Sequence, residues 1–320
     1  LTSFWRSRLF YCAGFEPFLS QSLFLTAIHF RYNKRNRNFR SLRDREALDV
    51  AYYFSKSAVK LLQYKVLKWL SYASCLIMLL VSFNGVVVTR TGSGLECGRE
   101  FPLCHEKFVP GTTMGSLIEY THRLTAGIAG IIALATLVAF LIWARKRRDF
   151  QIYAAIMSFF VIVQAAMGAL AVVFSQSAPI MALHFGFALI AFASALVLAL
   201  SVRRAGNLER YQAPPETQRV SKRTRNLTIF SAVFTYVVVY TGALVSHTQL
   251  AKVSVALHIA SALLLLLVLM VGHMAIRNYS HIPDIRKLGI IVIVLMIALP
   301  LSGVLNLVVL GSEYYMFAPM

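Results

Sequence analysis

The sequence predicts an all-α fold, a polytopic membrane helix bundle with seven transmembrane helices. Three observations support it. Of the 320 residues, 58% are hydrophobic and only 14% are charged, and the mean hydropathy is +0.65, which leaves too little charge to cover a soluble domain. Seven apolar segments reach the length of about 20 residues that crosses a hydrocarbon core of about 30 Å. The basic residues concentrate in alternate links between these segments, which is typical of multi-pass membrane proteins.

The seven segments are expected to be helices, because a backbone in lipid must satisfy its hydrogen bonds within its own segment. They cover residues 67–88, 118–143, 151–174, 179–202, 226–246, 253–276 and 288–310.

A weak internal repeat divides the predicted helices into two groups. The end of the first helix, NGVVVTRT, resembles the end of the fifth, TGALVSHT, so that Gly85 aligns with Gly242. In the same way, QAAMGAL in the third helix aligns with LPLSGVL in the seventh. We therefore predict one complete four-helix unit at 67–202, a basic cytoplasmic linker at 203–225, and an incomplete second unit at 226–320.

The distribution of charge predicts the topology. A net charge of +19 could indicate nucleic-acid binding. The basic residues lie between long apolar runs, however, and not along one amphipathic face, so we expect membrane lipid and no nucleic acid as a partner. The links 144–150, 203–225 and 277–287 carry fourteen Lys and Arg residues, and the links 89–117, 175–178 and 247–252 carry four. This asymmetry predicts a cell-membrane protein with a cytoplasmic N-terminus and an external 89–117 loop.

Residues 1–66 differ from the rest of the chain. They are rich in Arg, begin with Leu1, and contain an apolar run, 19–30, that is too short to cross a membrane. We interpret them as a basic N-terminal extension, either a disordered cytoplasmic tail or upstream sequence joined to the true start. A membrane-surface helix is the alternative. No role is assigned to this stretch.

Three histidines occupy equivalent places in the predicted helices. His122, His184 and His258 each lie four or five residues inside the external end of a helix that runs inwards, so they lie at nearly the same depth. An ionisable side chain within a membrane helix is costly and indicates function, although a single buried histidine is often only a hydrogen-bonded core residue. Three at one depth favour axial ligation of haem iron between helices. Zinc would require ligands drawn together, with Cys or carboxylate among them.

Two charged residues adjoin the first of these histidines. Glu119 lies three residues before His122 and shares its helix face. We predict that Glu119 is a catalytic carboxylate that handles protons beside the haem, and the alternative is a capping acid in the first helical turn. Arg123 is predicted to pair with a haem propionate, and the alternative is an interfacial arginine that extends its side chain to water.

The external loop contains the closest pair of cysteines. Cys97 and Cys104 are separated by six residues, and the loop is predicted to face an oxidising compartment, where they could form a disulfide. Such a bond would make the loop a compact lid beside the haem site. It would act either as a structural staple or as a dithiol that exchanges with a partner.

These motifs together resemble the haem A synthase family, in particular its bacterial branch with cysteines in the first external loop. The resemblance rests on TGSGLECGREFPLCH at 91–105, EYTHR at 119–123, and QAAMGALAVVF followed by IMALHFG at 164–186. It is strong over residues 67–202 and looser over 226–310.

The resemblance implies a function and a set of site residues. Members of the family oxidise a methyl group of haem O to the formyl group of haem A, for terminal oxidases. Substrate haem would bind between His122 and His184, Glu119 would take part in catalysis, and Cys97 and Cys104 would form a disulfide. His258 would be one of two ligands of a haem B cofactor in the second half. Haem O synthase and a terminal oxidase are the expected protein partners.

The sequence departs from the family pattern in two places. The second external loop, HTQLAKV, has no cysteine pair. The family has eight helices, and here the spacing from Gly168 to His184, counted from Gly303, ends on Pro319. We therefore expect this sequence to lack the eighth helix and the fourth haem ligand, and the second haem site to be incomplete.

Two other functions share part of this pattern. A membrane cytochrome b-like electron carrier would need the histidines but would require neither Glu119 nor the cysteine loop. A transporter could use membrane His and Glu residues as a proton relay.

Overall fold

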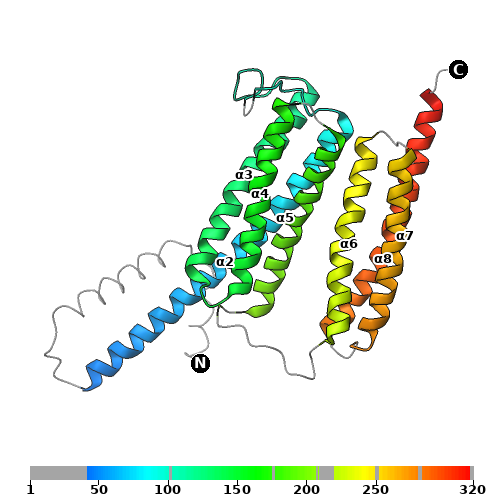
Figure 1. The fold of residues 1–320 in the computed structure, drawn as a ribbon. Helices are drawn as coiled ribbons and strands as arrows, with labels where there is room; N and C mark the ends of the chain where they lie inside the picture. Colours follow the sequence, from blue (N-terminus) through cyan, green and yellow to red (C-terminus); the bar gives the residue numbers. More distant parts are fainter. Residues whose placement is uncertain are drawn as a thin grey trace, which may run out of the picture.

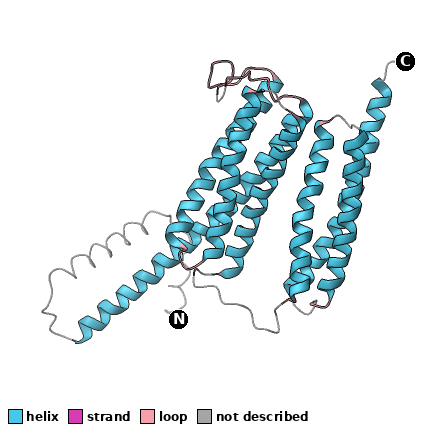
Figure 2. Cartoon of the chain, viewed as in Figure 1, coloured by secondary structure: helices cyan, strands magenta, loops and turns pink. Residues whose placement is uncertain are grey.

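The computed structural model of the chain describes residues 42–100, 103–174, 177–206, 208, 220–248, 252–279 and 283–317. This part of the chain consists of helices joined by loops (Figure 1, Figure 2). The helices are α2 (Leu42–Thr91), α3 (Met114–Trp143), α4 (Arg148–Val173), α5 (Ala178–Ala205), α6 (Lys222–His247), α7 (Lys252–Arg277) and α8 (Pro283–Phe317). The predicted all-α class is confirmed.

Seven helices in the described part are long and apolar enough to cross a membrane. Their order and number are those expected from the sequence, so the multi-pass architecture is confirmed. Most of the large apolar side chains on these helices face outwards, as lipid-facing residues do.

The main difference lies at the first helix. Helix α2 begins at Leu42, far ahead of the expected start at residue 67, and continues unbroken to Thr91. The segment from 42 to 66 contains neither Gly nor Pro, so nothing in it interrupts a helix. Residues 42–66 of the proposed basic extension are therefore helical. Residues 1–41 lie outside the described residues.

Local capping explains why two other helices begin before their apolar segments. Helix α3 starts at Met114, where the Thr113 side chain accepts a hydrogen bond from the Ser116 amide at 3.2 Å. Helix α6 starts at Lys222, where Ser221 accepts from the Thr224 amide at 3.2 Å. Hydropathy locates the segment that suits lipid, whereas a cap fixes where the helix starts.

Helices α2, α3, α4 and α5 form a closed four-helix arrangement. Helix α2 packs against α3 and α5, and α4 packs against the same two helices. The other three helices follow in sequence beside this unit, with α6 against α5, α7 against α6, and α8 against α7 (Figure 1).

Small residues allow the four helices to approach closely. One buried cluster contains Ala129 and Ala133 of α3, Ala191 and Ala195 of α5, and the larger Met157 of α4. Serine and threonine side chains add hydrogen bonds between helices. Ser74 of α2 bonds Thr136 of α3 at 2.9 Å, and Ser158 of α4 donates to the Ala133 carbonyl at 3.0 Å. Such contacts replace the hydrophobic effect, which lipid weakens between helices.

We predict that Ala133→Leu destabilises the bundle, because Ala133 is 1% exposed in the packed cluster. Overpacking of this kind costs about 1–3 kcal/mol, so the midpoint of thermal unfolding in detergent should fall by several degrees. The matched control is Ala135→Leu, the same substitution at an exposed position of the same helix. Equal midpoints for the two variants would contradict the packing described.

Candidate functional site

The loop between α2 and α3 is closed by a disulfide between Cys97 and Cys104. Both cysteines are buried, at 0% and 1% exposure. Beyond the second cysteine the chain turns sharply: Cys104 and Lys107 exchange backbone hydrogen bonds of 2.8 and 3.1 Å. The two residues between them, His105 and Glu106, both have positive φ values, as in a type I′ turn. The expected disulfide is confirmed.

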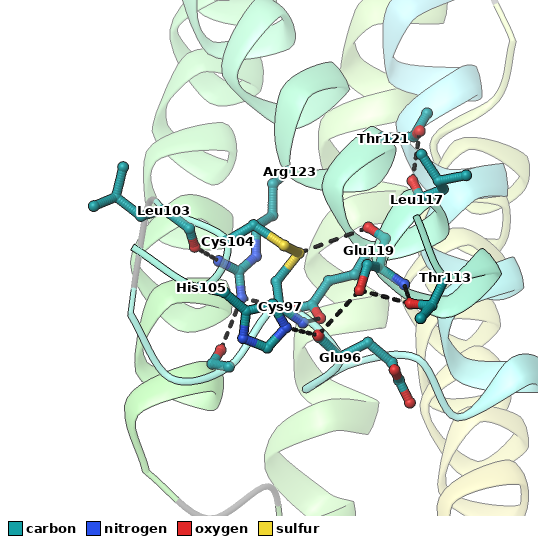
Figure 3. Close-up of a disulfide and its surroundings, with 12 residues drawn as sticks. Glu96, Cys97, Leu103, Cys104, His105, Thr113, Leu117, Glu119, Thr121 and Arg123 are labelled. Atoms are coloured by element: carbon teal, nitrogen blue, oxygen red, sulfur yellow. Dashed lines mark hydrogen bonds and ion pairs between the residues drawn. A yellow bond between two sulfur atoms is a disulfide. The ribbon is translucent and has the colours of Figure 1, made fainter. Parts of the chain in front are cut away.

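Glu119 and Arg123 of α3 bind this loop directly (Figure 3). The Cys97 amide donates to Glu119 Oε2 at 2.7 Å. Arg123 forms an ion pair with the other carboxylate oxygen of Glu119. The same guanidinium donates to the carbonyls of Leu103 at 2.8 Å and Gly98 at 3.3 Å. The Glu119–Arg123 pair of α3 therefore binds the loop close to both cysteines of the disulfide.

A second set of contacts fixes the loop to the start of α3. The carbonyl of Glu96 accepts from Ser116 Oγ at 3.2 Å and lies 2.8 Å from His105 Nε2. Gly115 lies directly beneath Glu96, where an added Cβ would be 2.7 Å from Glu96 Cγ. The glycine therefore permits the loop to dock closely, and Figure 3 shows the resulting cluster around Glu119.

The structure excludes the alternative roles considered for these two charged residues, a capping acid for Glu119 and a water-exposed side chain for Arg123. Glu119 does not cap the first turn, because α3 starts at Met114, its first turn has no acidic residue, and Thr113 is the cap. Arg123 does not extend to water, since its side chain is only 9% exposed and its partners are Glu119 and loop carbonyls. A proton-handling role for Glu119 and a propionate contact for Arg123 stay predictions.

Each of the three candidate histidines lies against a glycine of the preceding helix. A Cβ on Gly85 of α2 would lie 3.3 Å from His122 Cε1. The same construction gives 3.6 Å for Gly168 of α4 against His184, and 2.9 Å for Gly242 of α6 against His258. The three antiparallel pairs α2–α3, α4–α5 and α6–α7 thus repeat one contact, in which an imidazole packs on a bare stretch of helix backbone.

The three histidines lie at similar depths. His122 is the ninth residue of α3, and His184 and His258 are each the seventh residue of their helices. At about 1.5 Å per residue they lie about 9–12 Å from the helix starts, which are at one end of the bundle in Figure 1. They are deeper than the four or five residues expected, because all three helices begin before their apolar segments.

The surroundings of the rings fit a haem ligand. All three histidines are only partly buried. His122 Nδ1 has no hydrogen-bond partner among the described residues, a property it shares with His273 Nδ1 of α7, so the fit to haem rests on the position of the rings and not on this atom. His258 Nδ1 lies 3.1 Å from Thr241 Oγ1, whose hydroxyl donates to the Val238 carbonyl at 2.9 Å. Thr241 can then accept from Nδ1–H, which leaves Nε2 as the nitrogen able to bind a metal.

Sequence reasoning missed several residues that position the histidines. Gln164 donates to the His184 carbonyl at 2.5 Å, and Thr241 and Ser261 bond each other at 3.0 Å beside His258. The sequence feature that could have identified them is a polar residue within an apolar helix, close to a repeated glycine. Gly85 and Gly242 were recognised as a repeat, but their contact with the imidazoles was not.

Residues 68–257 match the cytochrome oxidase assembly protein family, over more than half of the chain. The chain belongs to this family. The match includes Glu119, His122 and His184 and ends one residue before His258. The resemblance seen in the sequence motifs is therefore confirmed.

Named relatives refine the comparison. The chain is 44% identical over 186 residues to a haem A synthase of Bacillus pumilus, 42% identical over 189 residues to one of Bacillus licheniformis, and 41% identical over 189 residues to one of Shouchella clausii. These alignments cover 57–58% of this chain. The chain spans about 60% of the length of these relatives, between 59% and 61%.

We predict that alanine at the repeated glycines disturbs haem binding in the order Gly242, Gly85, Gly168. An added Cβ would approach the imidazole to 2.9, 3.3 and 3.6 Å respectively. The first distance forces a shift, the second requires the ring to move by a few tenths of an ångström, and the third is an ordinary van der Waals contact. Haem per purified protein, measured by absorbance, checks the order. Gly303→Ala is the control, because among the described residues no atom beyond its own stretch of helix lies within 4 Å of its Cβ position. An equal loss in Gly303→Ala and Gly242→Ala would refute the ring contact.

Proposed function

We propose that this protein is a haem A synthase, a membrane oxidoreductase that converts a methyl group of haem O to the formyl group of haem A. The observation that carries the proposal is the family match over the helices that hold Glu119, His122 and His184. It is strengthened by relatives of 41–44% identity that bear this name.

His122 and His184 are proposed to bind the substrate haem. They lie on α3 and α5, two helices of the closed four-helix unit, and each is packed on a glycine of its neighbour. The ring atom nearest to each glycine is Cε1, so the contact positions each imidazole against its neighbouring helix, and imidazole is a common axial ligand of haem iron. The half-buried state of both side chains is consistent with this role.

His258 is proposed to bind a haem B cofactor, with Thr241 orienting the imidazole. When bound, haem B would supply an iron centre able to exchange electrons with the substrate site. Hydrogen bonds to the far nitrogen of a ligating histidine orient it and raise its basicity. The 3.1 Å contact between His258 Nδ1 and Thr241 Oγ1 supports this assignment.

Glu119 is proposed to accept protons during the reaction. Written as a half-reaction, oxidation of a methyl group to a formyl group takes its oxygen atom from one water molecule and releases four protons and four electrons. A carboxylate three residues from His122 is well placed to accept protons. The Cys97 amide and the Arg123 guanidinium bind the two carboxylate oxygens of Glu119 and so fix its position on α3.

The cellular setting is proposed from the charge pattern and the family. We place the protein in the cell membrane with the disulfide loop outside, because the links at the opposite end carry most of the Lys and Arg residues. Haem O synthase and a terminal oxidase are the proposed partners, in keeping with the family's role in cytochrome oxidase assembly.

His122→Ala and His184→Ala should each lower haem A formation by about 100-fold or more, since loss of an outer partner alone costs a metal site about 10- to 100-fold. The measurement is haem extraction from membranes supplied with haem O. His273→Ala is the control, a half-buried histidine four residues before the end of α7, the helix end that lies opposite to the disulfide loop in Figure 1. Normal haem A in either site variant would sink the assignment. A pigmented wild-type protein that makes no haem A would indicate an electron carrier.

Glu119→Gln should retain haem yet lose about 100-fold in activity, since general acid–base groups contribute at least that factor. Glutamine keeps an acceptor for the Cys97 amide but cannot take up a proton. Reduction of the disulfide by a thiol reagent, followed in parallel, tests whether the loop stays closed. Full activity, or an activity loss matched by a loop that opens freely, would reduce Glu119 to a structural anchor. Thr121→Ala, which removes a hydroxyl bonded only within α3, is the control.

A further inference from the structure

A basic pocket lies at the end of the four-helix unit opposite to the disulfide loop. It has a volume of about 330 Å³, and its walls come from α2, the end of α3, the α3–α4 turn and the residues that follow α5. The residues used below are Lys60, Tyr64, Trp143, Arg145, Lys146 and Leu208. None of the candidate haem ligands lines this pocket.

The contacts of Arg147 fix the α3–α4 turn, on which two exposed cationic residues lie. Arg147 is buried, forms a bidentate ion pair with Asp149 at 3.0 and 2.6 Å, and stacks on the Phe150 ring at 3.7 Å. The Arg147 amide also donates to the Ala144 carbonyl at 2.9 Å. These contacts fix the turn, so that the exposed residues between its ends, Arg145 and Lys146, are held in place.

The long helix α2 provides the opposite wall. Its first half continues past the ends of α3, α4 and α5 (Figure 1). The Tyr64 hydroxyl donates to the Val202 carbonyl of α5 at 3.1 Å, which ties α2 to the end of the unit. Lys60 lies one helical turn before Tyr64, on the same face, and so faces the turn residues across the pocket.

The chemistry of the lining is that of a lipid headgroup site. Among the described residues that line the pocket, three side chains are cationic and none is acidic. Trp143 and Leu208 add apolar surface beside the cations, and Trp143 is the last residue of a membrane-spanning helix. Tryptophan and basic residues at this level are typical of the boundary between lipid and water, and basic pockets among membrane helices bind anionic headgroups.

We propose that this pocket binds the phosphate of an anionic phospholipid from the adjacent leaflet, with Lys60, Arg145 and Lys146 around the phosphate and the acyl chains along the apolar wall. Free phosphate would use the cations but would leave the apolar wall uncovered. The position of the pocket at the helix ends favours lipid. The bound lipid would clamp the extended half of α2 to the α3–α4 turn.

The test uses the full chain with Trp5→Phe and Trp69→Phe, so that Trp143 is its single tryptophan. In zwitterionic nanodiscs, brominated phosphatidylglycerol should quench Trp143 fluorescence at a mole fraction about tenfold lower than brominated phosphatidylcholine does. Substituting Lys60, Arg145 and Lys146 together with Gln should abolish this difference. The charge-preserving triple variant Lys60→Arg, Arg145→Lys, Lys146→Arg should retain it, which separates loss of charge from failure to fold.

The matched control replaces Lys222, Arg223 and Arg225 with Gln, removing the same charge from exposed positions at the start of α6. This variant should keep the preference for the anionic lipid. Equal quenching by both lipids in the parent protein, or an equal loss in both Gln variants, would overturn the proposal. Displacement of the brominated lipid by millimolar inorganic phosphate would also overturn it, because the site would then be one for free phosphate.

Discussion

One contact recurs in this protein and underlies its proposed site: an imidazole ring packs against a neighbouring helix at a glycine. A side chain larger than hydrogen at Gly242 would meet His258 at 2.9 Å, and Gly85 is nearly as close to His122. At these two glycines the close contact leaves no room for a larger side chain between the paired helices. Because three pairs repeat it, the histidines lie at one depth, and a flat macrocycle could lie alongside each of them.

A buried charge pair governs the end of the bundle nearest to the histidines. Glu119 is 3% exposed, and an isolated carboxylate there would be very costly. Arg123 and the Cys97 amide compensate for that cost, and Arg123 also binds two loop carbonyls. The disulfide loop is thereby attached to Glu119, which lies three residues before His122 on α3. Removing one member of such a pair typically costs about 3–5 kcal/mol, so the loop and the carboxylate are coupled in stability as well as in space.

Different interactions stabilise the opposite end of the four-helix unit. There the charges are cations near water, supported by one buried arginine, Arg147, and by the Tyr64 contact with α5. The two ends correspond to the two tasks proposed for the protein, haem chemistry at one and anchoring to lipid at the other. The packed cluster that contains the alanines lies on the helices that connect these two ends.

Composition and hydropathy were sufficient for the fold class and the number of helices, because lipid imposes the same requirement on every spanning segment. Counting along the predicted helices was sufficient to place the three histidines at similar depths. Hydropathy did not predict where the helices start. At Leu42 and Met114, helix-forming residues and a cap extend the helices beyond their apolar parts. The contacts of Arg123 with Leu103 and Gly98, and of each histidine with its glycine, emerged only from the folded chain. They join residues on different segments, and their formation depends on how each helix is rotated and aligned against its neighbour, which a one-dimensional pattern does not contain.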